Sequence, residues 1–288
     1  MNIKIGTRKS RLAIAQTKAV IEELKKHFPA DTFEIVGIST LGDRDIKTEL
    51  QNFGDKGVFI KEIESALLRG EIDMAVHSAK DMPTEICGGL EIGAVLLRAD
   101  RRDVLVSLSD ITAISVPVIG TGSVRREMQA KKLFKNAVFK PIRGNIGTRL
   151  AKVKSGDYDA VIIAKAAIDR LGITDFIVSD LGDNFICAAA QGIIAVETIK
   201  DKMKRYTNAI NDAKVMTEFT AERAFLEYTG GGCHTPCGAS AVFDGTKTVM
   251  KTFFGDTKKS ICLEMSGHNP KKLGKEMALT TLARMEDK

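Results

Sequence analysis

The residues best suited to covalent chemistry in this chain lie in a glycine-rich segment at positions 230–238, which reads Gly-Gly-Gly-Cys-His-Thr-Pro-Cys-Gly. Glycine accepts unusual backbone dihedrals and lets another group approach closely, and Pro236 stiffens the exit from the turn. A backbone this flexible is not typical of ordinary core. The pattern therefore predicts that Cys233 is presented so that its thiol can bond to something.

Several partners for Cys233 remain open at this point. A zinc site is one option, although the spacing of the nearby cysteines and histidines matches none of the common zinc modules. A second thiol and a covalently bound ligand are two others, and a free cysteine can also be an inert, buried apolar residue. The candidate metal ligands are Cys233, His234, Cys237, Cys262 and His268.

A lysine and a carboxylate follow a strand pattern at residues 73–77. The segment 77–83 reads His-Ser-Ala-Lys-Asp-Met-Pro. Ligands of open α/β sheets bind beyond the carboxyl ends of the strands, so we expect Lys80 and Asp81 to face a binding crevice. The alternative is that Asp81 starts a turn before Pro83 while Lys80 is solvated.

Two further turns combine glycines with arginines. Residues 120–126 read Gly-Thr-Gly-Ser-Val-Arg-Arg, and residues 143–149 read Arg-Gly-Asn-Ile-Gly-Thr-Arg. Each is expected to join a strand to a helix, where free backbone amides suit an anion. The first matches neither a P-loop nor a dinucleotide fingerprint, and its alternative is a surface helix with two exposed arginines. Because guanidinium binds carboxylate or phosphate bidentately, the two turns together predict a ligand with several acidic groups.

The elements that position these residues alternate between strand and helix patterns, which indicates βαβ architecture. Ser10 is placed to cap the first helix, and Gly70 to end the second. Strands are expected at 3–6, 33–38, 73–77, 116–120, 138–142, 160–164, 239–243, 249–254 and 261–265. Helices are expected at 11–28, 58–69, 123–134, 146–155, 193–206 and 218–228, with a last helix after Pro270.

Composition excludes several classes of protein. At 288 residues, with 44% hydrophobic and 28% charged residues, the chain is expected to form two or three α/β domains and not a disordered or membrane protein. The net charge of +6 comes without a basic tract interleaved with aromatics, which favours a pocket for a small anion over nucleic acid. Five scattered cysteines and no signal-peptide core predict reduced thiols and a cytoplasmic location.

Taken together, the motifs closely resemble the porphobilinogen deaminase family, also called hydroxymethylbilane synthases, over nearly the whole chain. Any one of these segments could match by chance, but six of them occur in the order of the family. The matching segments are Gly-Thr-Arg-Lys-Ser-Arg-Leu-Ala at 6–13, Gly-Val-Phe-Ile-Lys-Glu at 57–62, the segments 77–83, 120–126 and 143–149 quoted above, and Gly-Gly-Cys-His-Thr-Pro at 231–236.

The resemblance implies an α/β fold with three domains. The first two resemble type II periplasmic binding proteins and flank an active-site cleft, and the third is a small α+β domain. Domain 1 would be discontinuous, at 1–96 and 194–214, with domain 2 at 97–193 and domain 3 at 215–288. The family is expected to act as a monomer, without nucleic-acid or membrane partners.

The resemblance also implies an activity. A dipyrromethane cofactor, one per chain, would be attached through a thioether to Cys233, and four porphobilinogen molecules would be added to it stepwise with loss of ammonia. Hydrolysis would then release the linear tetrapyrrole hydroxymethylbilane for haem biosynthesis. Asp81 would be the catalytic carboxylate, contacting pyrrole N–H groups and stabilising the cationic azafulvene. Each pyrrole carries an acetate and a propionate, which agrees with the arginine-rich turns.

The remaining site residues follow from the same resemblance. Those expected at the cofactor are Cys233, Lys80, Asp81, Ser123, Arg125, Arg126, Arg143 and Gly144. Those expected at the substrate are Arg8, Ser10, Arg149, Arg170, Gln191, and Lys56 and Phe59 on a mobile loop; no metal is expected.

The chain departs from the family pattern at Asn52, Asp55, Ala190 and Cys237, and the first two could change the electrostatics of the loop. A two-lobed binding protein for a multi-carboxylate ligand is the competing function. Ligand capture alone would not need Asp81 or Cys233, so these two residues favour an enzyme.

Overall fold

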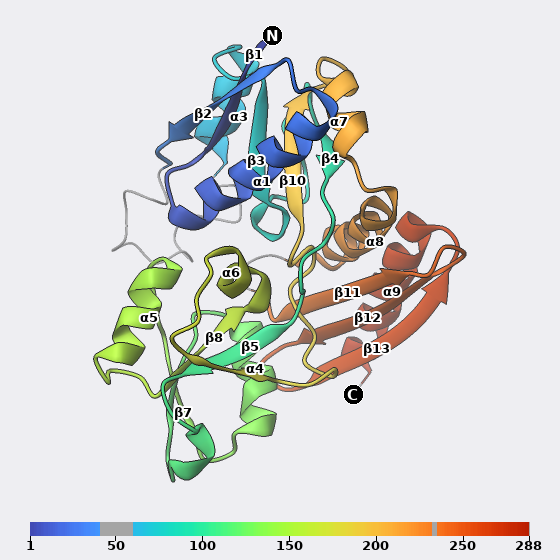
Figure 1. Cartoon of the computed structure of the whole chain (residues 1–288). Helices are drawn as coiled ribbons and strands as arrows, with labels where there is room; N and C mark the ends of the chain where they lie inside the picture. Colours follow the sequence, from blue (N-terminus) through green and yellow to red (C-terminus); the bar gives the residue numbers. More distant parts are fainter. Residues whose placement is uncertain (41–59, 232–234, 288) are drawn as a thin grey trace. The chain divides into compact units, whose positions relative to one another are not determined.

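The computed structural model of the protein describes residues 1–40, 60–231 and 235–287. The chain forms two compact units (Figure 1). Unit 1 comprises Met1–Ala99 and Gly192–Phe219, so it is discontinuous in the sequence. Unit 2 comprises Asp100–Gln191 and Thr220–Lys288. Most residues of the expected second and third domains lie in unit 2, and the division into three domains stays a prediction.

Unit 1 contains a five-stranded sheet in the order β2-β1-β3-β10-β4. The first three of these strands are parallel, and β10 is antiparallel to both of its neighbours. The strands are β1 (Asn2–Arg8), β2 (Thr32–Ile38), β3 (Met74–Ser78), β4 (Leu90–Val95) and β10 (Ile194–Ile199). The helices are α1 (Arg11–His27), α3 (Lys61–Leu68), the 3-10 helix η2 (Ala79–Asp81) and α7 (Lys204–Ile210).

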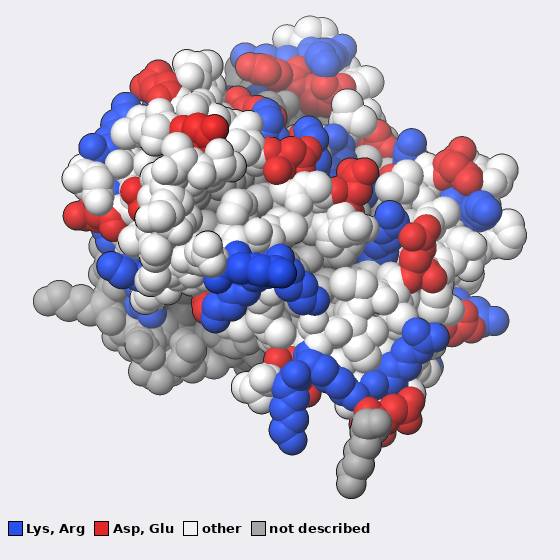
Figure 2. All heavy atoms as spheres, turned by 90° about the horizontal axis from the view of Figure 1, so that it is seen from below, with Lys and Arg blue, Asp and Glu red and all other residues white. Residues whose placement is uncertain are grey.

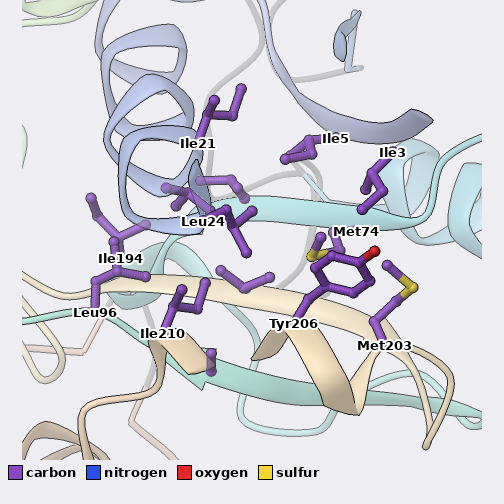
Figure 3. Packing of buried hydrophobic residues seen from close by; sticks show 14 residues of the cluster. Ile3, Ile5, Ile21, Leu24, Met74, Leu96, Ile194, Met203, Tyr206 and Ile210 are labelled. Carbon is purple, nitrogen blue, oxygen red and sulfur yellow. The ribbon is translucent and has the colours of Figure 1, made fainter. Parts of the chain in front are cut away.

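Helix α1 and the sheet of unit 1 share one core. The helix begins where expected, because the Ser10 hydroxyl accepts a hydrogen bond from the backbone N–H of Ala13. Its buried face packs with side chains of the sheet and of α7. Figure 3 shows the ring of Tyr206 from α7 beside Met74 of β3 and Met203, in the same cluster as Leu24 of α1. This packing holds α1 against β3 and α7.

The helix predicted at 193–206 is wrong in its first half. Residues 194–199 form β10, and only Lys204–Ile210 form a helix, α7. A short apolar run cannot be assigned from periodicity alone, and Ile-Ile-Ala-Val-Glu-Thr-Ile is rich in β-branched residues. Residues 194–198 of β10 are all buried, so both faces of the strand are covered and no alternation of polar residues marks it as a strand.

The larger sheet of unit 2 repeats the strand arrangement of unit 1. Its order is β7-β6-β8-β5-β9, with β6, β7 and β8 parallel and β5 antiparallel to its neighbours. The strands are β5 (Asp103–Ser107), β6 (Val118–Gly120), β7 (Val138–Lys140), β8 (Ala160–Ala164) and β9 (Ile177–Asp180). The helices are η3 (Ile111–Ala113), α4 (Val124–Leu133), α5 (Ile146–Lys154) and α6 (Lys165–Arg170).

The C-terminal part of unit 2 is a three-stranded antiparallel sheet in the order β11-β12-β13. The sheet forms one hydrophobic core with helices α8 and α9. The last helix, expected after Pro270, begins with Pro270 itself and is capped by Asn269. These elements are α8 (Ala213–Thr229), which begins in unit 1, and β11 (Cys237–Phe243), β12 (Thr248–Gly255), β13 (Ser260–Gly267) and α9 (Pro270–Glu286). Two α/β sheets of one strand order and a small sheet-and-helix part confirm the predicted fold class.

The surface carries charges of both signs. Figure 2 shows lysine and arginine side chains close to aspartate and glutamate side chains over the visible face. In the part of the chain that the structure describes, no helix is both long enough and apolar enough to span a bilayer.

Candidate active site

A small pocket of unit 1, about 70 Å³ in volume, collects chemistry-bearing side chains from two strand ends. Arg8 is the last residue of β1, and Asp81 is the last residue of η2, the single turn that follows β3. Both line the pocket, as does Ser10. The side chain of Asp81 is exposed to solvent. The structure therefore brings together three of the residues expected at the site.

Hydrogen bonds between residues far apart in the sequence hold the walls of this pocket. The amide nitrogen of Gln16 on α1 lies 2.9 Å from the hydroxyl oxygen of Ser78, which joins the helix to the end of β3. The backbone N–H of Ala79 donates to the carbonyl of Ile193, just before β10. Asp81 therefore extends from a turn that is fixed on both sides. Gln16 was not foreseen from the sequence, although its place one and a half turns after Ser10 puts it near the same helix end.

A buried ionisable pair lies next to the pocket. The Nε2 atom of His77, a lining residue, is 3.1 Å from a carboxylate oxygen of Glu197 on β10, and both side chains are buried. On α3, the pKa of Glu64 is raised, first by burial and then by the charge of Glu197. A glutamate within an apolar run is the signal that could have pointed to Glu197, because a buried acid requires a partner.

In unit 2, the turn after β6 places two arginines inside the protein and not on its surface. Ser123 caps α4 by accepting a hydrogen bond from the backbone N–H of Arg126. The side chains of Arg125 and Arg126 are buried, with 4% and 8% of their surface exposed. Two exposed arginines, the alternative considered for this turn, are therefore not what the structure contains. A cation at a helix N-terminus opposes the helix dipole, so these arginines need an anion close by.

Asp103, the first residue of β5, supplies one such anion. One of its oxygens accepts hydrogen bonds from Arg126 and from the amide of Gln191, and the other lies 2.8 Å from Nη1 of Arg125. Burial raises the pKa of Asp103, but the charges of Arg125 and Arg126 outweigh it and hold that pKa well below its usual range. Asp103 was not foreseen; an acid directly before the apolar run Val-Leu-Val was the available signal.

The second glycine–arginine turn is more exposed. Asn145 caps α5, with its side-chain oxygen accepting from the backbone N–H of Thr148. Gly144 has a φ of 102°, which favours glycine, and Nε of Arg149 donates to the Gly144 carbonyl at 2.8 Å. Arg143 is exposed, whereas Arg170 at the end of α6 is half-buried and burial lowers its pKa. Lys80, in η2 of unit 1, is half-buried.

Both ends of the glycine-rich loop are described, and its C-terminal end lies against Arg125. A Cβ atom on Gly238 would come within 3.0 Å of Cδ of Arg125 and within 2.7 Å of the carbonyl oxygen of Cys187. Only glycine allows this approach, so the arginine packs on the first residues of β11. The predicted site residues Cys233, Lys56 and Phe59, together with His234, Asn52 and Asp55, lie outside the described residues.

Cys237 belongs to a hydrophobic core and not to an open site. Its side chain packs among apolar residues of α8, β12 and α9, and burial raises its pKa to about 12. Cys262, by contrast, is exposed on β13. Among the described residues, no group of three or more His, Cys, Asp or Glu side chains is arranged to hold a metal ion.

Two family models match segments that together extend over both units. Residues 3–207 match a family model described as porphobilinogen deaminase, dipyromethane cofactor binding domain. Residues 216–283 match a model described as porphobilinogen deaminase, C-terminal domain. Among solved structures, the BenM effector binding domain with its effector benzoate is 11% identical, with a TM-score of 0.44, and the match covers 73% of this chain and 88% of that one.

Curated relatives match over almost the whole length. The porphobilinogen deaminase of Geobacillus kaustophilus is 42% identical over 286 residues, covering 96% of this chain and 93% of the relative. That of Lachnospira eligens is 40% identical over 289 residues, covering 96% of this chain and 98% of the relative. The chain therefore belongs to the porphobilinogen deaminase family, the dipyrromethane-dependent transferases that join four porphobilinogen molecules into hydroxymethylbilane for tetrapyrrole biosynthesis.

Proposed function

We propose that Asp81 is the catalytic carboxylate of this enzyme and that Cys233 carries the dipyrromethane cofactor through a thioether. The observation that carries this proposal is the buried arginine pair of unit 2. Arg125 packs on Gly238, which follows Cys233 by only five positions in the sequence. A group attached to Cys233 would thus lie near guanidinium groups suited to its acidic side chains.

The residues of unit 2 fit a ligand that carries several carboxylates. Two guanidinium groups surround the single carboxylate of Asp103, which leaves one positive charge in excess within a buried cluster. Another partner of Arg125, the carbonyl of Ile186, accepts a hydrogen bond from Nη1 but brings no negative charge. A buried excess charge is costly unless an anion pairs with it. A carboxylate of the cofactor would supply that anion.

Asp81 would act through its charge and its access to the ligand. When bound, the cofactor supplies the pyrrole carbon at which the first porphobilinogen is joined. As ammonia leaves porphobilinogen, positive charge develops on the substrate, and an ionised carboxylate fixed beside it stabilises the transition state. The same carboxylate can accept hydrogen bonds from pyrrole N–H groups and assist in removing the proton displaced at the coupling carbon.

The other predicted residues would hold the acetate and propionate groups. Arg8 and Ser10 share the pocket with Asp81, and the hydroxyl of Ser10 keeps its proton for donation while its oxygen caps α1. Ser123 stands in the equivalent position at the start of α4. The remaining residues proposed to bind cofactor or substrate carboxylates, or to cover them, are Lys80, Arg126, Arg143, Gly144, Arg149, Arg170, Gln191, Lys56 and Phe59.

We also propose that the enzyme is a cytoplasmic monomer without nucleic-acid or membrane partners. Its composition supports this: the cysteines are odd in number, and the described ones are free thiols. Light scattering during gel filtration tests the oligomeric state. A mass near the 31.3 kDa of one chain is expected, and a mass near twice that value contradicts the monomer.

Intact-protein mass spectrometry tests the attachment site. The wild-type mass should exceed the sequence mass by one dipyrrole, and Cys233→Ala should lose that increment. Cys237→Ala is the matched control and should keep it, because the Cys237 thiol is buried and its raised pKa of about 12 leaves almost no thiolate at neutral pH. An increment that disappears in Cys237→Ala would overturn the assignment.

A further inference from the structure

Asp103 makes polar contacts with three of the residues proposed to bind cofactor or substrate. Its Oδ1 atom lies 2.7 Å from Nη2 of Arg126, 3.0 Å from Nε of Arg126 and 2.8 Å from the amide nitrogen of Gln191. Its Oδ2 atom lies 2.8 Å from Nη1 of Arg125. One carboxylate therefore links the start of α4 with the segment that ends at Gln191.

The rest of this cluster is built from backbone carbonyls. Nη1 of Arg125 donates to the carbonyl of Ile186 at 2.6 Å, and Nη1 of Arg126 donates to the carbonyl of Ile162 at 3.0 Å. Carbonyl groups fix the direction of each guanidinium but bring no negative charge. Asp103 is the one carboxylate that forms an ion pair with either arginine among the described residues.

The position of Asp103 follows from the fold. It opens β5, the antiparallel strand of the sheet, and pairs in register with Ala164, the last residue of β8. The carboxyl end of β8 and the start of β5 therefore lie together at the edge of the sheet where α4 begins after β6. Because β5 runs antiparallel, its first residue, and not its last, reaches the ligand-binding edge.

We infer that Asp103 is a positioning residue that holds the guanidinium groups of Arg125 and Arg126 together. Its negative charge balances one of their two positive charges and leaves a single positive charge, which a carboxylate of the cofactor neutralises. This inference rests on the proposed function, because it takes the two arginines as cofactor ligands. Without Asp103 the two like charges would repel each other inside the protein. The carboxylates of the cofactor would then be the remaining negative charge near them.

A distinct thermodynamic signature follows. A merely structural residue, when replaced, lowers the melting temperature of the protein equally with and without cofactor. Replacing Asp103 should instead make stability depend more strongly on the cofactor, because a ligand that pairs the uncompensated charges stabilises the folded state preferentially. The measured quantity is the increase in melting temperature due to the cofactor.

The experiment compares four proteins by differential scanning fluorimetry, with attachment checked by intact mass. Asp103→Asn keeps the shape of the side chain and removes its charge. Each background is measured with Cys233 and with Cys233→Ala, which sets the cofactor-free reference. The increase in melting temperature should be at least about twofold larger in Asp103→Asn than in wild type. Equal increases in the two backgrounds would overturn the inference.

Asp180→Asn is the matched control, because Asp180 is an exposed carboxylate of the neighbouring strand β9 and pairs with the exposed Arg102. It should behave as wild type. If Asp103→Asn does not fold, Asp103→Asn combined with Arg126→Gln removes one charge of each sign and should restore folded protein. Failure of both variants to fold would contradict the inference that Asp103 acts by balancing the charge of the arginines.

The outcome also separates this inference from the proposed function. If wild type carries no mass increment on Cys233, the proposed function fails. If wild type and Asp180→Asn carry the increment and Asp103→Asn shows no larger increase in melting temperature, only the role of Asp103 fails.

Discussion

The turn after β1 and the turn after β6 occupy equivalent places in two sheets of the same strand order, yet they handle charge in opposite ways. Each turn leads into a helix capped by a serine, Ser10 or Ser123. In unit 1 the residues of this turn share a small pocket with Asp81, which follows the neighbouring strand β3 and whose carboxylate stays exposed. In unit 2 the two arginines are buried and paired with Asp103. The same edge of an α/β sheet can therefore present either an accessible reactive group or a buried, fixed binding site for a charged ligand.

The largest expected effect concerns Asp81, because this residue is proposed to face the charge that develops during the reaction. Asp81→Ala should lower kcat by about 10³-fold, which combines lost electrostatic stabilisation and lost proton transfer. The cofactor mass increment and the melting temperature should hardly change, since the side chain is exposed. Steady-state turnover of porphobilinogen measures the effect. Glu85→Ala, which removes an exposed acid of the same segment, is the control. Near-normal turnover of Asp81→Ala would show that the exposed carboxylate of unit 1 is not the reactive group.

Arg126 should behave in the opposite manner, with a large effect on stability. Arg126→Met leaves Asp103 with one fewer partner in a buried cluster, which should lower the free energy of unfolding by about 3 kcal/mol. Urea unfolding measures it. Arg102→Met removes an exposed arginine just before β5 and should cost at most about 1 kcal/mol. Similar losses of unfolding free energy in the two variants would show that the buried ion pair of Arg126 stabilises the protein no more than the exposed ion pair of Arg102.

Acid should reduce the stability that Asp103 contributes through its ion pairs with Arg125 and Arg126. The pKa of Asp103 in the folded protein lies below its unfolded value near 3.8, so its ionised form contributes stability above that pH and loses it as the pH falls further. The contribution is on the order of 2 kcal/mol. The difference in unfolding free energy between wild type and Asp103→Asn should therefore shrink between about pH 5 and pH 2. A difference that stays constant over this range speaks against an ionic role.

The two helix caps should give the smallest effects and should be alike. Ser10→Ala and Ser123→Ala each remove a side-chain acceptor at a helix start, which costs about 1 kcal/mol. Urea unfolding of the two variants, each compared with wild type, provides the measurement. A loss several times larger in Ser123→Ala than in Ser10→Ala would mean that the cap also supports the arginine cluster.

Local sequence predicted much of this molecule because local interactions decide it. Ser10, Ser123 and Pro270 mark helix starts at the residues where the helices begin. The turns at 120–126 and 143–149 join strands to helices as expected. The placement of Asp81 beyond the end of β3 also follows from the strand pattern and the general rule for α/β sheets.

Long-range contacts account for what was missed. Nothing local distinguishes the apolar run at 194–199 from a helix, because its character as β10 depends on strands on both sides. The partner of Glu197 is His77, distant in sequence, and Asp103 finds Arg125 and Arg126 across the sheet. Ion pairs of this kind leave no periodic pattern.

The sequence by itself determined the caps, the turns, the glycine-framed Cys233 and the arginine-rich segments, because each depends on residues close together in the chain. Only the tertiary structure decided that Arg125 and Arg126 are buried, that Asp103 joins them, and that Cys237 belongs to the core. Burial and charge pairing depend on which distant strands are neighbours, and a linear pattern of residue types does not encode that.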